Sequence, residues 1–179
     1  MYSIDTDEWT EGASTTTARI QHACCEIKDD AGNIIKILVA GGHVGTAPPF
    51  FKSTEIYDVA QKTWTNGPDL DTEINNSRLI TAPLGSRYAA YILTGVHATD
   101  NQKDIHGISK DLTKWTKLGS IQRERAATTL VMISPDLVDG WNCEGKVSYI
   151  VMAFYRIKIS YIIKYLGILQ SFKLILFRR

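Results

Sequence analysis

The sequence predicts an all-β fold made of repeated four-stranded antiparallel sheets. Three observations lead to this prediction. Trp9, Trp64 and Trp115 recur at intervals of 55 and 51 residues. Two apolar stretches that begin and end with glycine, 32–42 and 85–95, align without gaps. Short apolar runs are separated by clusters of Gly, Asn, Asp and Pro, which are typical of turns between strands.

Each of these tryptophans is expected to begin the last strand of a unit. An aromatic residue precedes it with six residues between, as Tyr2 precedes Trp9 in YSIDTDEW and Tyr57 precedes Trp64 in YDVAQKTW. The third copy, ISKDLTKW, has Ile108 in the aromatic position. This spacing predicts a hairpin whose large rings form a face for packing one sheet on the next.

The glycine-bounded stretches predict the strand before each hairpin. GNIIKILVAGG ends at Gly42, after Gly41, and GSRYAAYILTG ends at Gly95. Glycine is suited to the end of such a strand, because the backbone can turn there and a neighbouring sheet can come close without meeting a side chain.

An arginine-led apolar stretch is expected to supply the first strand of each unit. These stretches are RIQHACCEI from Arg19, RLITAPL from Arg78 and RAATTLVMI from Arg125. The predicted unit is therefore an arginine strand, a glycine strand, an aromatic strand and a tryptophan strand.

A further glycine strand is predicted at 145–153, GKVSYIVMA, whose Gly145 aligns with Gly32 and Gly85. The alignment ends at Phe154, where glycine is due, and this divides the chain into a repeat region at 1–153 and a basic, apolar tail at 154–179. The tail has 19 residues, 159–177, that could enter a membrane, but their apolar side chains only offset the two lysines among them. We expect appended, non-homologous sequence rather than an anchor; the alternation in 155–161 also fits an edge strand.

Composition restricts the function classes. The chain has 179 residues, 44% of them hydrophobic, which is enough for a core. Residues 1–144 carry 13 basic and 19 acidic side chains, a net charge of −6, whereas 145–179 carry seven basic and no acidic ones. An acidic folded region disfavours nucleic acid as a partner.

The repeated unit resembles the kelch repeat. The best-matching segments are ILVAGGH, TEIYDVAQKTW and TNGPDL. The departures are Thr94 in place of the first glycine of a pair and the missing aromatic before Trp115. The resemblance implies an incomplete kelch-type β-propeller with two whole repeat periods plus flanking strands, rather than another antiparallel sandwich. Its repeat-defining residues are Trp9, Gly41, Gly42, Tyr57, Trp64, Gly95 and Trp115.

The same resemblance implies a protein-interaction module of the scaffold or substrate-adaptor type. Its partner would be a protein, such as a ubiquitin-ligase substrate or a cytoskeletal protein, and it would need no cofactor. The alternatives are a fragment of a propeller enzyme such as an oxidase, epimerase or specifier protein, or a truncated product without function. The first segment carries no signal peptide, which leads us to expect a cytoplasmic protein.

By resemblance, the partner surface consists of the loops at 43–54, 65–77, 96–104 and 116–124. Paired phenylalanines beside a lysine suggest a hot spot in the first loop, although the rings could equally fold back onto the sheet. The three arginines could bind an acidic peptide, but arginines that recur in a repeat are more often structural. The candidate partner-binding residues are His43, Phe50, Phe51, Lys52, Arg78 and Arg125.

No residue pattern predicts catalysis or a metal site. The histidines at 43, 97 and 106 have no carboxylate or nucleophile at a useful spacing. Cys24, Cys25 and Cys143 form no metal-binding motif and are expected to be free thiols. Asn75-Asn76-Ser77 is a glycosylation sequon, which matters only in a secreted protein.

Overall fold

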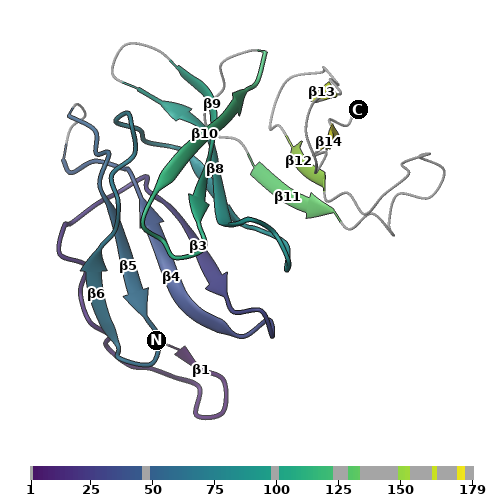
Figure 1. Cartoon of the computed structure of the whole chain (residues 1–179). Helices are drawn as coiled ribbons and strands as arrows, with labels where there is room; N and C mark the ends of the chain where they lie inside the picture. The colour runs from purple at the N-terminus through teal and green to yellow at the C-terminus, as the bar shows by residue number, and fades with distance from the viewer. Residues whose placement is uncertain are drawn as a thin grey trace.

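A computed structural model describes residues 2–45, 49–97, 101–122, 129–133, 149–153, 163–164 and 173–175. All regular structure in these ranges is β, which confirms the predicted all-β class. Figure 1 shows two whole sheets in the first two thirds of the chain and a further sheet that begins at β11.

The first whole sheet contains four antiparallel strands in chain order. They are β3 (Ala23–Lys28), β4 (Ile34–Ala40), β5 (Thr54–Asp58) and β6 (Thr63–Asn66). Asp29 shapes the β3–β4 turn, because its Oδ1 accepts hydrogen bonds from the backbone N–H groups of Ala31 and Asn33 at 3.0 and 2.8 Å. Side-chain acceptance of this kind is the reason aspartate favours turns.

The second whole sheet repeats this arrangement. Its strands are β7 (Arg78–Thr81), β8 (Tyr88–Val96), β9 (Asn101–Ser109) and β10 (Trp115–Ser120), again antiparallel and in chain order. The two sheets correspond to the two repeat periods predicted from the sequence, and we refer to them as the first and second blades.

Shorter elements flank the blades. The hairpin of β1 (Tyr2–Ser3) and β2 (Glu8–Trp9) precedes the first blade. The third four-stranded sheet contains β11 (Thr129–Ile133), β12 (Tyr149–Ala153), β14 (Lys173–Ile175) and β13 (Ile163–Lys164), in that spatial order. In this sheet β12 pairs with β14 in parallel, which differs from the antiparallel pairing expected for a blade.

The tail is therefore only partly described. Its residues 163–164 and 173–175 extend the sheet of β11 and β12, whereas 155–161, the expected edge strand, lie outside the described residues. The division of the chain at residues 153 and 154 stays a prediction.

The hairpins share one register. Tyr2 lies opposite Trp9, Tyr57 opposite Trp64, and Ile108 opposite Trp115. The ring centroids of the two tyrosine–tryptophan pairs are 5.2 and 5.1 Å apart. The six-residue spacing in the sequence thus reflects a direct cross-strand pair, which is the unit of sheet stabilisation.

The first two strands of each unit also share a register. Ala23, Arg78 and Thr129 each lie 14 positions after a repeat tryptophan (9, 64 and 115), and their partners are Ala40, Leu93 and Ala153. The glycine-strand alignment that placed 145–153 in register with the earlier repeats is consistent with this pairing.

This register corrects the expectation that all three arginines occupy one repeat position, because Arg19 and Arg125 share it and Arg78 does not. Arg78 begins β7 and is equivalent to Ala23, which begins β3. Arg19 lies before β3, ten positions after Trp9, and its equivalent after Trp64 is Ile74. The alignment by residue type was wrong because an apolar residue can replace arginine at the same backbone position.

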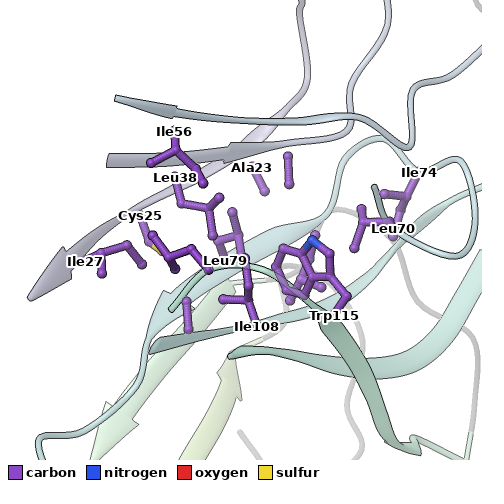
Figure 2. Packing of buried hydrophobic residues seen from close by; sticks show 14 residues of the cluster. Ala23, Cys25, Ile27, Leu38, Ile56, Leu70, Ile74, Leu79, Ile108 and Trp115 are labelled. Atoms are coloured by element: carbon purple, nitrogen blue, oxygen red, sulfur yellow. The ribbon is translucent and has the colours of Figure 1, made fainter. Parts of the chain in front are cut away.

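The core lies between the two blades. Alternate residues of β3 are buried, and they pack against residues of the second blade, as Figure 2 shows. Leu38, Ala90 and Ile108 are completely inaccessible. Burial of a large apolar side chain contributes about 1.5–3 kcal/mol, so this contact is the main source of stability between the blades. The buried cluster comprises Ala23, Cys25, Ile27, Leu38, Ala40, Ile56, Leu70, Ile74, Leu79, Ala90, Ile92, Ile108, Leu112 and Trp115.

Candidate interaction surface

The two ends of the blades differ in the length of their connections. Antiparallel order places the connections β4–β5 (41–53) and β6–β7 (67–77) at one end, which we call the loop end. Tight connections at 29–33, 59–62 and 110–114 lie at the opposite end, the turn end. Loops held by a rigid scaffold are the usual place for binding residues.

His43 and Phe50 lie inside the first loop rather than on its surface. The ring of Phe50 is only 7% exposed, and its centroid is 5.8 Å from that of His43, which is also buried. Backbone bridges join His43 to both Ile20 and Phe50. Of the two alternatives for the paired rings, Phe50 follows the second, because the loop folds back and continues the pairing of the sheet beyond β4.

Phe51 and Lys52 are more accessible. Phe51 is half-buried, with the guanidinium carbon of Arg19 5.5 Å from its ring centroid. Lys52 is exposed, and its Nζ lies 3.5 Å from a carboxylate oxygen of Asp69 in the second loop. Of the candidate residues in the first loop, Lys52 is the one that extends into solvent.

Arg19 has a structural role. Its guanidinium donates hydrogen bonds to the carbonyls of Gly41 and Ser53 at 2.8 and 3.1 Å, and to Glu55 Oε1 at 2.6 Å. Both side chains of this ion pair are almost completely buried. The pair ties the segment before β3 to the end of β4 and to β5.

Glu55 accepts further hydrogen bonds from the backbone N–H groups of Thr16 and Thr17, at 2.7 and 3.2 Å. Desolvation raises the pKa of Glu55, but the hydrogen bonds from Thr16 and Arg19 outweigh it and hold the pKa below its ordinary value. Glu55 is therefore ionised in the folded protein at neutral pH.

Of the other two arginines, Arg125 has the repeat position of Arg19, ten positions after a tryptophan, whereas Arg78 lies 14 positions after one. Arg78 is half-buried and donates to the carbonyl of Ser77 at 2.8 Å, within its own segment. Arg125 lies outside the described residues. Their role in binding a partner stays a prediction.

A polar cluster centred on Gln21 was not identified from the sequence. Gln21 Oε1 lies 3.0 Å from His43 Nε2 and accepts from the amides of Asn75 and Asn76 at 3.1 and 3.3 Å. Gln21 and Asn76 each lie 12 positions after a repeat tryptophan, and both have positive φ, 55° and 48°. This cluster could have been suspected from the sequence, because a polar residue stands at the same distance after both tryptophans.

The sequon at Asn75 is part of this cluster. Asn75 is 4% exposed, its amide nitrogen is hydrogen-bonded, and its backbone pairs with Val96. The folded protein therefore presents no accessible acceptor nitrogen at this position.

The strand-end glycines permit close approaches of backbone segments, between the blades at Gly41 and within the second blade at Gly95. A Cβ added at Gly41 would lie 2.3 Å from the carbonyl oxygen of Ile74, and one added at Gly95 would lie 2.7 Å from that of Asn75. The segment that enters the second blade thus passes directly over the end of β4, where Gly42 N–H donates to Ile74 O at 2.8 Å. This is the close approach predicted from the sequence.

The repeat tryptophans connect consecutive units. Trp64 Nε1 donates to the carbonyl of Ala13 at 2.9 Å, and Trp115 Nε1 donates to that of Pro68 at 3.1 Å. Both acceptors lie four positions after the preceding tryptophan. Each unit is thus attached to the segment that leaves the one before it.

Charged groups of the second blade also reach the loop end. His106 is buried, with Nε2 3.6 Å from an oxygen of Asp71, and Lys117 bonds Asp104 at 2.6 Å. Burial lowers the pKa of His106, although the carboxylates of Asp71 and Asp104 oppose this shift. His106 is neutral at pH 7 and serves packing.

Among the described residues, no three His, Cys, Asp or Glu side chains are placed to hold a metal ion. Burial raises the pKa of the Cys25 thiol to about 12, so this thiol is unreactive, whereas Cys24 is exposed. The described ranges also contain no helix with the length and apolar character needed to cross a membrane.

Comparison with known families agrees with the repeat. Residues 36–70, which include most of β4 together with β5, β6 and part of the second loop, match the kelch motif. A search of curated proteins gave no significant match to the chain.

Proposed function

Since this chain carries a kelch motif in blade-type antiparallel sheets, we propose that it binds a protein partner through its loop end. A kelch motif is typical of repeat domains that mediate protein–protein interaction. We propose further that the chain serves this partner as a scaffold or substrate adaptor.

The observation that carries this proposal is the difference between the two ends of the blades. At the loop end, the long connection within the first blade (41–53) and the one between the two blades (67–77) come together and present charged side chains to solvent. Lys52 pairs with Asp69 between the two loops, and the Asp71 side chain is exposed beside them. The turn end has only short turns, which offer less area to a partner.

The charges suggest what kind of partner fits. The loop end presents both signs, so a partner segment with alternating charges would satisfy them. Complementary charges of this kind place a partner in register and select against mismatched ones. The half-buried ring of Phe51 next to them adds apolar area.

The test is a selection of peptides from a displayed random library on the full chain, followed by calorimetry with the selected peptide. The first variant removes the loop-end ion pair, Lys52→Ala with Asp69→Ala. The matched control removes an exposed ion pair at the turn end, Lys110→Ala with Asp30→Ala, whose Nζ–O distance is 2.7 Å.

The loop-end variant should weaken peptide binding at least about tenfold, which corresponds to about 1.4 kcal/mol, and the control should bind like the unmodified protein. Equal weakening by the two variants, or failure to select any peptide, would count against the proposal.

A further inference from the structure

A cavity lies between the turn ends of the two blades. It has a volume of about 330 Å³ and is lined by the β3–β4 turn and by two connections of the second blade, β7–β8 (82–87) and β9–β10 (110–114). We call it the turn-end cavity. Its volume falls at the lower end of the range of about 300–1,000 Å³ for small-molecule sites, which often lie where two structural units meet.

Two contacts between the blades border the turn-end cavity. Lys110 Nζ lies 2.7 Å from Asp30 Oδ1, and a Cβ added at Gly32 would lie 3.9 Å from Leu84 Cδ1. Both contacts join the β3–β4 turn to the second blade, one through each of the two lining connections. Because the space is bridged at two places, it suits a compact small molecule better than an extended peptide.

The lining of the cavity is largely apolar. Ile27 and Leu112 are buried side chains of the core, at 3% and 7% exposure. Ile35 and Leu84 also line the cavity but remain 41% and 60% exposed, so a ligand could cover apolar area that solvent now contacts. The half-buried ring of Tyr88 completes this lining and offers a surface for aromatic stacking.

Two carboxylates of the cavity are already occupied by their own turns. Asp29, besides its backbone hydrogen bonds, accepts one from the side-chain amide of Asn33 at 3.0 Å. Asp111 accepts hydrogen bonds from the hydroxyls of Ser109 and Thr113, at 2.5 and 2.9 Å. These acceptors are therefore poorly placed to recognise a ligand cation.

Three lysines also line the cavity, and they differ in how closely a carboxylate holds them. Lys36 pairs with Asp58 at 2.8 Å, and Lys110 is held by its bridge to the first blade. Lys28 lies 3.5 Å from Glu26, in a pair whose two side chains are 37% and 43% exposed. The Lys28 ammonium is thus the one best able to accept another carboxylate, as a charge-assisted hydrogen-bond donor.

We propose that the turn-end cavity binds a small aromatic carboxylate. The apolar lining around Ile27 and Leu112 takes the rings, and the ammonium of Lys28 takes the carboxylate. A neutral ligand with the same rings loses the ionic contact, and a cationic one is repelled by the lysines. This site lies at the opposite end of the blades from the loops proposed to bind a protein, so it stands or falls independently of that proposal.

The experiment titrates the isotope-labelled full chain with naphthoate and follows the amide chemical shifts by NMR. Naphthylmethanol and naphthylmethylammonium serve as matched probes, because they carry the same two rings with a neutral and a positive group. The shifts locate the bound probe, and their dependence on concentration gives its affinity.

Two pairs of variants separate the contributions of charge and apolar area. Lys28→Gln removes the proposed ammonium, and Lys62→Gln removes an exposed one in the turn at 59–62, which does not line the cavity. Leu84→Ala removes exposed apolar lining, and Val59→Ala removes an exposed apolar side chain of that other turn. All four positions are partly or fully exposed, and urea unfolding checks that each variant is folded.

Naphthoate should shift the amides of 29–33, 82–89 and 110–114, and naphthylmethanol should bind at least about tenfold more weakly. We expect Lys28→Gln to weaken naphthoate binding about fivefold, which is appropriate for a partly exposed ion pair. Leu84→Ala should weaken it about threefold through lost apolar contact. Both control variants should bind naphthoate like the unmodified protein.

Four outcomes would overturn the proposal. The first is the absence of amide shifts at millimolar naphthoate, and the second is shifts confined to the loop end at 41–53 and 67–77. The third is equal affinity for the three probes, which would show that the site does not recognise a carboxylate. The fourth is equal weakening by Lys28→Gln and Lys62→Gln, which would show that only net charge matters.

Discussion

The two blades share one backbone register but differ in the chemistry that supports it. Ten positions after the preceding tryptophan stand Arg19 in the first blade and Ile74 in the second; nine positions before the blade's own tryptophan stand Glu55 and His106. The first blade therefore has a buried ion pair where the second has a buried apolar residue and a neutral imidazole.

This difference shows that the repeat is not specified by the residues at these two positions. Strand pairing, the second strand-end glycine (Gly42 and Gly95) and the tryptophan hydrogen bonds are the same in both blades. The buried ion pair contributes little net stability if both partners are replaced together, but removal of one partner leaves a buried charge.

The largest expected effect follows from the same substitution at the two equivalent positions. Glu55→Gln leaves the Arg19 guanidinium buried without a counter-ion and should reduce the free energy of unfolding by about 3–5 kcal/mol. His106→Gln exchanges one neutral polar side chain for another and should cost about 1 kcal/mol. Urea unfolding of the full chain measures both, and equal losses would contradict the difference between the blades.

A smaller effect is expected from the repeat tryptophans. Trp115 is buried, so Trp115→Phe loses a hydrogen bond and leaves a gap, at a total cost of about 2 kcal/mol. Trp64 is half-exposed, and Trp64→Phe should cost less than about 1 kcal/mol. Thermal or urea unfolding measures both variants. A larger loss of unfolding free energy for Trp64→Phe than for Trp115→Phe would show that Trp64 carries the contact between units.

The smallest effect is a pH dependence that separates the blades. The pKa of His106 is lowered in the folded protein from its ordinary value of 6.5. Below pH 6.5 the unfolded chain therefore binds a proton at this histidine more readily than the folded protein does. The stability due to neutral His106 is complete above pH 6.5 and is lost as the pH falls through the folded pKa.

The free energy of unfolding should therefore change less between pH 7 and pH 5 for His106→Gln than for the unmodified protein. The contribution of Glu55, whose pKa is lowered from 4.5, is lost only at lower pH, as the pH falls through its folded pKa. An identical slope in the two proteins from pH 7 to pH 5 would exclude this role of His106.

The hairpins and glycine strands could be predicted from the sequence because their signals are local. The distance from Tyr57 to Trp64 is fixed by one tight turn, and Gly41 is required where a backbone approaches. The motif match at 36–70 covers this well-defined part of the repeat.

The different position of Arg78 could have been found in the sequence by counting from the tryptophans, whereas the burial of Phe50 could not. Arg19 and Ile74 occupy equivalent positions although their side chains share no property that an alignment by residue type detects. Phe50 is buried because its loop bridges to His43, which in turn depends on the entering segment at Ile20. These contacts join segments that are far apart in the sequence, so local residue patterns do not predict them.

The central claim is that the two blades pack closely because the segment that enters the second blade passes directly over Gly41 at the end of β4. Gly41 and Gly45 test it, because their φ angles are nearly equal, 68° and 66°. A Cβ at Gly41 would meet the carbonyl of Ile74, whereas one at Gly45 would have no atom within 4 Å.

The direct measurement is the difference in unfolding free energy between Gly41→Ala and Gly45→Ala. Both variants carry the cost of a left-handed alanine, about 1–2 kcal/mol. Gly41→Ala should lose at least about 1 kcal/mol more, because the second blade must shift to accept the methyl group. Equal losses for the two variants would contradict the packing of the blades described for this protein.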